Sequence, residues 1–195
     1  PTRSALLGLL GACLGVRRED RTGLEQLEAG IHLAVRVDQR QPEGFDKPLV
    51  TQKLLDYHTV RNARQEYSGL KSHETIQTWR EYLSDCEFSI VLWLAETSVL
   101  SMGELEQAVK QPRFTPYLGR RSCPLGRPLF ASRCSAKDEF AALATLEPAR
   151  GVIYTETRPL EGQKVRTLKM RDVPLTRQSR QFASRLVYEY GGMDV

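Results

Sequence analysis

The alternation of apolar and polar residues predicts most of the helices and strands. The leucines from Leu6 to Leu14 form one apolar face of a helix, and Gly15 follows as its stop signal. Ile31 to Asp38 alternates strictly, which is typical of a half-buried strand with His32 on its polar face. The apolar run Phe88 to Leu94 is the strongest strand signal in the chain, and we expect it at the centre of a sheet.

Capping residues and turn signals locate the remaining elements. Thr22 to Glu25 forms a capping box that opens a short helix ending near Gly30, and Ser101 to Glu104 forms another that opens a helix to Lys110. A further helix follows the capping residues Ser135 to Asp138. Three strands are expected after it: Gly151 to Thr155, Lys164 to Met170 and Leu186 to Tyr190.

A long polar stretch interrupts this pattern. Two apolar pairs, Leu49-Val50 and Leu54-Leu55, could form a strand pair, and Asp56 to Glu81 then mixes polar residues with aromatic and basic side chains. We interpret this stretch as a hairpin or extended loop that projects from the fold. Long excursions from a compact domain are usually functional or disordered.

The order of the elements indicates an α+β fold. If a strand preceded residue 1, the first portion would have the order β-α-β-β-α-β, which is that of a ferredoxin-like (RRM-like) sheet with its helices on one face. We therefore expect a ferredoxin-like domain over residues 1–118, apparently missing its first strand, with an insertion at 56–83. A smaller β-rich portion is expected over residues 119–195.

Composition excludes several classes of protein. With 195 residues, 41% of them hydrophobic and 27% charged, the chain can close a core and is not disordered throughout. Its longest apolar run, Ile90 to Ala95, is far shorter than the roughly 20 residues of a membrane-spanning helix. No leader peptide is apparent. The four cysteines lack metal-ligand spacing, so we expect reduced thiols in a cytoplasmic protein with neither metal nor cofactor.

The positive charge is concentrated in two segments. Residues 111–133 contain five arginines and no acidic residue, and residues 158–185 contain eight basic residues against Glu161 and Asp172. The chain has 21 arginines and seven lysines. Because arginine binds phosphate in a bidentate manner and stacks on bases, this bias favours a nucleic-acid partner over a small acidic metabolite. A solvated basic face without a partner is the alternative.

The first candidate site is a glycine-containing basic loop, Tyr117 to Gly126. Gly119 would let backbone N–H groups approach phosphates closely, Arg120 and Arg121 would supply charge, and Tyr117 could stack on a base. The alternative is an ordinary basic turn on the surface.

The second candidate site is the excursion itself. Aromatic side chains such as Tyr57 and Trp79 lie among basic residues there, as in segments that contact single-stranded nucleic acid, although Trp79 could instead face the inside of a small helix. The same segment holds the candidates for metal-free RNA cleavage, Tyr57, His58, Lys71 and His73, as a general acid and base.

The third candidate site runs from Arg177 to Arg185. Its arginines, Arg177, Arg180 and Arg185, are separated by amide and hydroxyl side chains, which is the composition of a phosphate-contacting strand or loop. The alternative is a solvated edge strand, where positive charge prevents edge-to-edge pairing.

These segments together carry a family resemblance. The chain resembles the CasD subunits of Cascade, the type I-E CRISPR surveillance complex, which belong to the RAMP superfamily of ferredoxin-like RNA-binding proteins. The matching stretches are Pro1 to Gly15, Asp56 to Val60, Gly69 to Leu83, Tyr117 to Leu125, Arg180 to Arg185 and Gly191 to Val195. Members of the family open with a strand and a Gly/Pro-containing loop that this sequence lacks before Pro1.

The resemblance implies a non-catalytic role in antiviral defence. CasD-like subunits hold the 5′ handle of the CRISPR RNA, dock beside the CasC backbone filament and the large CasA subunit, and meet target DNA only through the complex. The 56–83 insertion would be the thumb that folds over the guide RNA. In a related subtype the counterpart cleaves RNA, so a metal-independent endoribonuclease is the alternative function.

The resemblance and the residue chemistry together define the expected RNA-binding residues, with no catalytic or metal-binding residue among them. The expected residues are Tyr57, His58, Arg61, Arg64, Lys71, His73, Trp79, Tyr117, Gly119, Arg120, Arg121, Ser122, Arg177, Arg180, Gln181 and Arg185.

Overall fold

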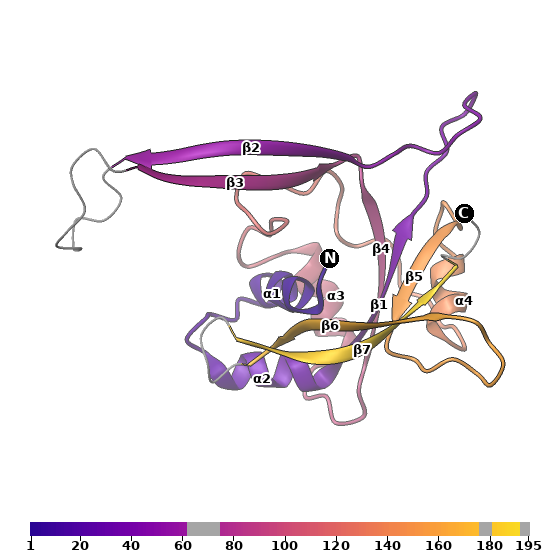
Figure 1. Cartoon of the computed structure of the whole chain (residues 1–195). Coiled ribbons are helices and arrows are strands. Elements are labelled where there is room, and N and C mark those ends of the chain that lie inside the picture. The colour runs from indigo at the N-terminus through magenta and orange to yellow at the C-terminus, as the bar shows by residue number, and fades with distance from the viewer. Residues whose placement is uncertain (62–74, 176–180, 192–195) are drawn as a thin grey trace. The chain divides into compact units, whose positions relative to one another are not determined.

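The structure is a computed structural model that describes residues 1–61, 75–175 and 181–191 (Figure 1). Internal contacts divide the chain into two units. The core unit comprises Pro1–Asp38 and Phe88–Val195, and the hairpin unit comprises Gln39–Glu87. The sheet of the core unit takes strands from both sides of the boundary expected at residue 118.

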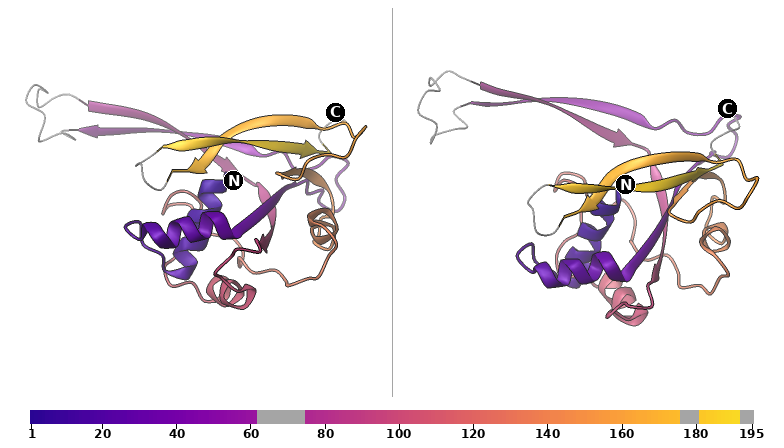
Figure 2. Two further views of the ribbon diagram at one scale, coloured as in Figure 1. Left: turned by 90° about the horizontal axis from the view of Figure 1, so that it is seen from below. Right: turned by 60° about the horizontal axis from the view of Figure 1, so that its bottom comes forward.

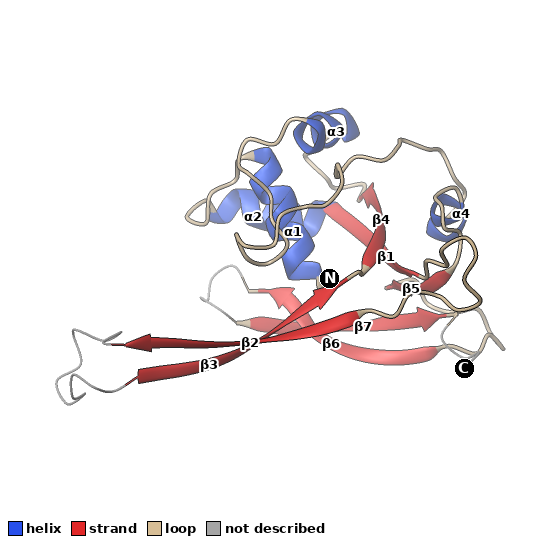
Figure 3. Ribbon diagram, turned by 90° about the horizontal axis from the view of Figure 1, so that it is seen from above, coloured by secondary structure: helices blue, strands red, loops and turns tan. Residues whose placement is uncertain are grey.

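The core unit is built on a five-stranded sheet with the order β4-β1-β5-β7-β6 (Figure 3). These strands are β4 (Glu87–Leu94), β1 (Ile31–Asp38), β5 (Gly151–Thr155), β7 (Phe182–Tyr190) and β6 (Arg166–Pro174). The pairs β1–β5, β5–β7 and β6–β7 are antiparallel. β4 is the first strand in this order, so the prediction that Phe88 to Leu94 lies at the sheet centre is wrong. An apolar edge strand is possible here because Leu92 and Leu94 pack against the helix-covered core.

The described part of the core unit also contains four helices, which begin at capping residues. They are α1 (Arg3–Leu14), α2 (Arg21–Gly30), α3 (Met102–Lys110) and α4 (Glu139–Ala144). The capping box at Ser101 is confirmed, and the left-handed Gly15 ends α1 as predicted. The prediction for α2 is wrong in its cap: Asp20, not Thr22, accepts the hydrogen bond from the backbone of Gly23. None of the helices in the described part of the chain is long and apolar enough to cross a membrane.

The core lies between the sheet and the first three helices (Figure 2). Its buried residues come from α1, α2, β1 and α3: Leu7, Leu10, Leu27, Ile31, Leu33 and Leu105. β1 is more deeply buried than its alternation predicts. His32 is exposed and stacks on Trp93, with ring centroids 5.5 Å apart, but Arg36 on the same face is only 2% exposed. Arg36 is covered because it donates hydrogen bonds to the carbonyls of Leu143 and Leu146 at the end of α4.

The hairpin unit consists of β2 (Gln52–Arg61) and β3 (Thr75–Ser84), which pair antiparallel along their whole length. The hairpin interpretation of the excursion is therefore confirmed. The strand pair suggested at Leu49-Val50 is not formed, since the first strand begins at Gln52 and runs through both Leu54 and Leu55.

Gly151 is a position in the core unit where a side chain would overlap the backbone of a neighbouring strand. Its φ is +148°, and a Cβ added there would overlap the backbone carbonyl oxygen of Val37 across the β1–β5 pair. We expect Gly151→Ala to lower the free energy of unfolding by about 2 kcal/mol in a urea titration, because the strained backbone or the strand pairing must yield. Gly126→Ala is the control, since nothing lies within 4 Å of its Cβ position. Equal stability of the two variants would contradict this account.

Candidate nucleic-acid interface

The basic loop around Gly119 is a tight chain reversal in the core unit. Tyr117 and Pro124 form an antiparallel bridge, and the amide of Leu118 donates to the carbonyl of Cys123 at 2.8 Å. The amide of Cys123 in turn donates to the carbonyl of Arg120 at 2.9 Å. Gly119 has a φ of +79°, a conformation that L side chains rarely adopt, and this explains the glycine in the sequence.

This reversal presents its polar groups outward. All four residues of the loop are exposed: Gly119, Arg120, Arg121 and Ser122. No atom outside the adjoining residues lies within 4 Å of the position that a Cβ at Gly119 would occupy. Tyr117, 42% exposed, lies at the base of the loop. Two guanidinium groups beside an open backbone position form a surface that can contact consecutive phosphates, with an aromatic ring next to them.

The hairpin places an aromatic pair on one of its faces. Tyr57 and Trp79 lie directly opposite each other in the β2–β3 register, with ring centroids 5.5 Å apart and a 44° angle between the rings. The two rings are 53% and 62% exposed. Trp79 therefore does not face the inside of a helix. The pair is a stacking platform of the kind that unpaired bases contact.

Tyr57 and His58 are separated by the alternation of the strand. Adjacent residues of a strand project to opposite faces, so His58 lies on the face opposite the Tyr57–Trp79 pair. Within the described residues, its Nδ1 atom is buried without a hydrogen-bond partner. Of the four candidates for metal-free RNA cleavage, Tyr57 and His58 therefore lie on opposite faces of the hairpin, and Lys71 and His73 lie outside the described residues.

Several expected residues lie where the structure gives no side-chain description. Arg64, Lys71, His73, Arg177 and Arg180 lie outside the described residues. Arg61 is known only from its backbone, which pairs with Thr75 at the end of the hairpin strands. Gln181 is exposed just before β7, and its carbonyl accepts a hydrogen bond from the amide of Leu175 at 3.0 Å.

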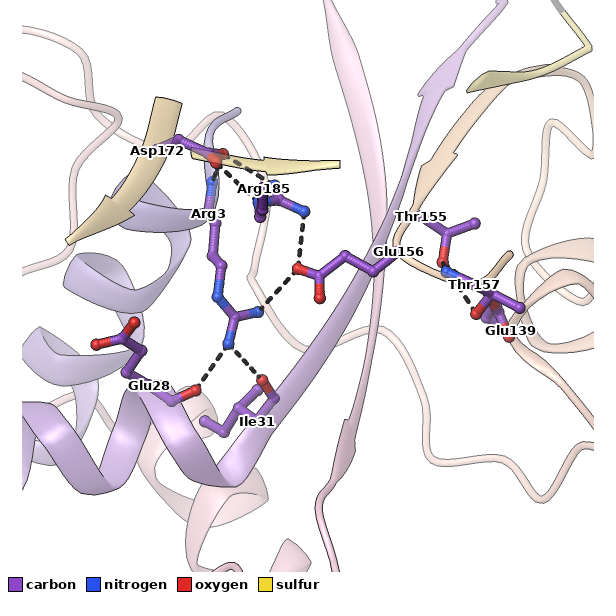
Figure 4. A network of polar contacts seen from close by, with 9 residues as sticks. All are labelled: Arg3, Glu28, Ile31, Glu139, Thr155, Glu156, Thr157, Asp172 and Arg185. Atoms are coloured by element: carbon purple, nitrogen blue, oxygen red, sulfur yellow. Dashed lines mark hydrogen bonds and ion pairs between the residues drawn. The ribbon is translucent and has the colours of Figure 1, made fainter. Parts of the chain in front are cut away.

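Arg185 has a different role from the one expected. Its Nε and one terminal nitrogen donate to the two oxygens of Asp172 at 2.7 and 2.9 Å, and its other nitrogen donates to Glu156 at 2.8 Å (Figure 4). The same Asp172 accepts the amide of Arg3 at 2.7 Å, and the Arg3 side chain donates to the carbonyls of Glu28 and Ile31. The guanidinium of Arg185 is thus occupied inside the protein, and we remove it from the RNA-contacting set.

The network around Asp172 makes stability depend on pH. Burial alone would raise the pKa of Asp172, but hydrogen bonds from Arg185 and the Arg3 amide outweigh it and lower the pKa below its usual value. The folded state therefore binds this proton more weakly than the unfolded state, so Asp172 stabilises the fold above about pH 4, and this contribution is lost as the pH falls through the lowered pKa.

We expect Asp172→Asn to have a lower thermal midpoint than the parent chain at neutral pH. The difference should shrink steadily in acid, because the parent loses the contribution that the variant never had. Thermal unfolding followed from neutral pH to below about pH 4 measures it. Two parallel curves over this range would show that Asp172 carries no such contribution.

The exposed apolar side chains of the hairpin unit are functional candidates that were not predicted from the sequence. Leu55 and Leu83 are more than half exposed on the same face as the aromatic pair, and Leu54 is exposed on the other face. Phe45 and Val50 are exposed in the segment before β2. The sequence feature that could have indicated them is the presence of apolar residues within a polar segment that contributes no described residue to the hydrophobic core. Such concentrations of exposed apolar surface mark sites of protein association.

Comparison with known proteins points to one group. The family described as CRISPR-associated protein (Cas_Cas5) matches residues 1–188. The CRISPR system Cascade subunit CasD of Escherichia coli (strain K12) is 51% identical over 196 residues, which cover 100% of this chain and 86% of that protein. A solved structure described as "Crystal structure of Cas protein" matches with a TM-score of 0.51 and 25% identity, over 97% of this chain and 79% of that one.

The fold and the sequence agree on the same assignment. The structural match covers 97% of this chain, and the match to the curated relative covers all of it, the basic loop and the hairpin included. The chain belongs to the Cas5 family of CRISPR-associated proteins and, within it, to the CasD subunits of type I-E Cascade.

Proposed function

We propose that this chain is the RNA-holding CasD subunit of a Cascade complex, which binds the 5′ handle of the CRISPR RNA without cleaving it. The observation that carries the proposal is the Gly119–Ser122 reversal, where two consecutive exposed arginines directly follow an open backbone position at Gly119. This is the geometry with which a protein holds consecutive phosphates. The 51% identity to a Cascade subunit supplies the biological setting.

The hairpin would contribute base contacts. Tyr57 and Trp79 offer two exposed rings, and base–aromatic stacking typically contributes about 1–3 kcal/mol per base. In this proposal the hairpin is the thumb that lies over the guide RNA. The core unit would have the ferredoxin-like RAMP fold, and the protein would act in the cytoplasm.

The exposed apolar residues of the hairpin unit support assembly with other proteins. Leu55, Leu83 and Val50 would be costly on a free surface and favourable against a neighbouring subunit. We assign this association to the CasC backbone subunit and the large CasA subunit. Target DNA would be met only through the assembled complex.

Trp79→Ala is expected to weaken binding of handle RNA about tenfold, because one stacking partner is lost. Fluorescence anisotropy with a labelled handle oligonucleotide measures it, and the salt dependence should stay unchanged since no charge is removed. Leu54→Ala is the control: it shortens an exposed apolar side chain on the opposite face of the same hairpin. Equal affinity of the two variants would remove the aromatic pair from the RNA site.

Cleavage of repeat RNA is the alternative function, and its candidate acids and bases are Tyr57, His58, Lys71 and His73. The opposite directions of Tyr57 and His58 speak against a shared catalytic site on the hairpin. If the chain cut repeat RNA and either His58→Ala or His73→Ala abolished the cut, the non-catalytic proposal would be wrong.

A further inference from the structure

The outward face of the β6–β7 pair has a composition unlike its inward face. At inward positions lie buried groups, such as Asp172, which bonds to Arg3 of α1, and Val187. The antiparallel register places Thr167 opposite Tyr188, Lys169 opposite Leu186 and Arg171 opposite Ser184. Directly opposed residues share one face of a sheet, so these six side chains make up the outward face.

Cations are the charged groups on this face. Lys169 and Arg171 are both exposed, and no acidic side chain occupies the other four positions. Among the described residues, neither cation forms an ion pair with a carboxylate. Being two residues apart on one strand, they are about 6.6 Å apart along it. A row of cations at this spacing matches a chain of regularly spaced anions better than it matches one isolated anion.

Apolar surface lies beside the cations. Leu186 is 50% exposed directly across from Lys169, and Phe182 is exposed at the start of the same strand. The Nε of Arg171 donates to the carbonyl of Phe182 at 3.0 Å, which holds the guanidinium close to this end of β7. Cations next to an exposed aromatic ring and a leucine are the mixture found where single-stranded nucleic acid lies on a protein surface.

We infer that the outward face of β6–β7 is a second contact surface for single-stranded RNA, separate from the Gly119–Ser122 loop. Lys169 and Arg171 bind neighbouring phosphates of the backbone, and Phe182 and Leu186 contact a base or ribose. This inference rests on the proposed function, because it assumes that the chain binds RNA and adds a second stretch of RNA that contacts the β6–β7 face. The contact is to the phosphate backbone and therefore does not depend on base sequence.

The test compares two charge-matched double variants of the full chain. Lys169→Ala with Arg171→Ala removes two charges from the face, and Arg17→Ala with Arg18→Ala removes two exposed charges between α1 and α2, next to Glu19 and Asp20. Binding of labelled oligouridine is measured by anisotropy over a salt series. The face variant should bind about tenfold more weakly, and its log–log salt slope should be smaller by about 1.4, that is 0.7 per lost phosphate contact. The control variant should keep the slope of the parent.

Two results would overturn the inference, and they can be told apart. If the face variant keeps the parental affinity and slope while the Arg120/Arg121 variant loses handle binding, the β6–β7 face is wrong and the proposed function stands. If the parent binds neither handle RNA nor oligouridine, both fail. Because all the substituted side chains are exposed, unchanged thermal midpoints are expected, and they confirm that each variant is folded.

Discussion

Replacing Arg120 and Arg121 together by alanine is expected to lower the affinity for handle RNA about 100-fold. Hydrogen bonds between charged partners typically contribute about 1.5–3 kcal/mol each, and Arg120 and Arg121 are both exposed in the loop. The salt slope should become smaller by about 1.4, since two phosphate contacts to a single strand are lost at about 0.7 each. Anisotropy of a labelled handle oligonucleotide across a salt series measures both quantities.

Two comparisons make this prediction specific. Arg120→Lys with Arg121→Lys keeps the charge but loses the planar bidentate geometry, so affinity should be intermediate and the slope should match the parent. The Arg17→Ala, Arg18→Ala variant removes the same charge from elsewhere on the surface and should bind nearly as well as the parent. Two results would remove the loop from the RNA site. In the first, the salt slope of the Arg17→Ala, Arg18→Ala control falls as much as that of the Arg120→Ala, Arg121→Ala variant. In the second, the Arg120→Ala, Arg121→Ala variant keeps the slope of the parent.

Arg36→Ala is expected to lower the free energy of unfolding by about 4 kcal/mol. The buried guanidinium pairs with Asp38, whose side chain is 1% exposed, and donates to the carbonyls of Leu143 and Leu146 beside α4. Removing it leaves a buried carboxylate with Ser89 as its remaining hydrogen-bond donor among the described residues, and it leaves two carbonyls without their donor. Urea unfolding of the core unit measures the loss.

Arg40→Ala serves as the matched control. Arg40 also pairs with a carboxylate, Glu87 at 3.1 Å, but its side chain is 57% exposed. An exposed ion pair contributes about 0–1 kcal/mol, so this variant should unfold close to the parent. If Arg36→Ala were no less stable than Arg40→Ala, the Arg36 network would not be what joins α4 to the sheet.

Local signals in the sequence predicted where helices and strands begin and end better than they predicted which strands pair in the sheet. Capping boxes and left-handed glycines act within one turn, so the helix after Ser101 and the stop at Gly15 could be predicted. The position of β4 at the sheet edge depends on which strand pairs with which, and a run of apolar residues does not encode that. For the same reason, alternation predicted the bounds of β1 but not the burial of Arg36, which depends on α4 more than 100 residues later.

The candidate sites also differ in whether they depend on adjacent residues or on pairing between strands. The Gly119 reversal was predictable because a positive φ and adjacent arginines are encoded in four consecutive residues. Arg185 was assigned to RNA because a basic residue in a basic segment looks solvated in the sequence. Its partner Asp172 lies across the β6–β7 pair, and only the strand register brings the two together. Pairing across strands therefore decides whether an arginine is a ligand or a structural group.

The most direct test of the central claim is one gel experiment with the full chain and labelled repeat RNA in EDTA, repeated across a salt series. The account predicts a shifted but intact RNA band whose affinity falls steeply with salt, and a shallower fall for the Arg120/Arg121 variant. A discrete cleavage product, or binding that ignores both salt and the Arg120/Arg121 substitution, would contradict it.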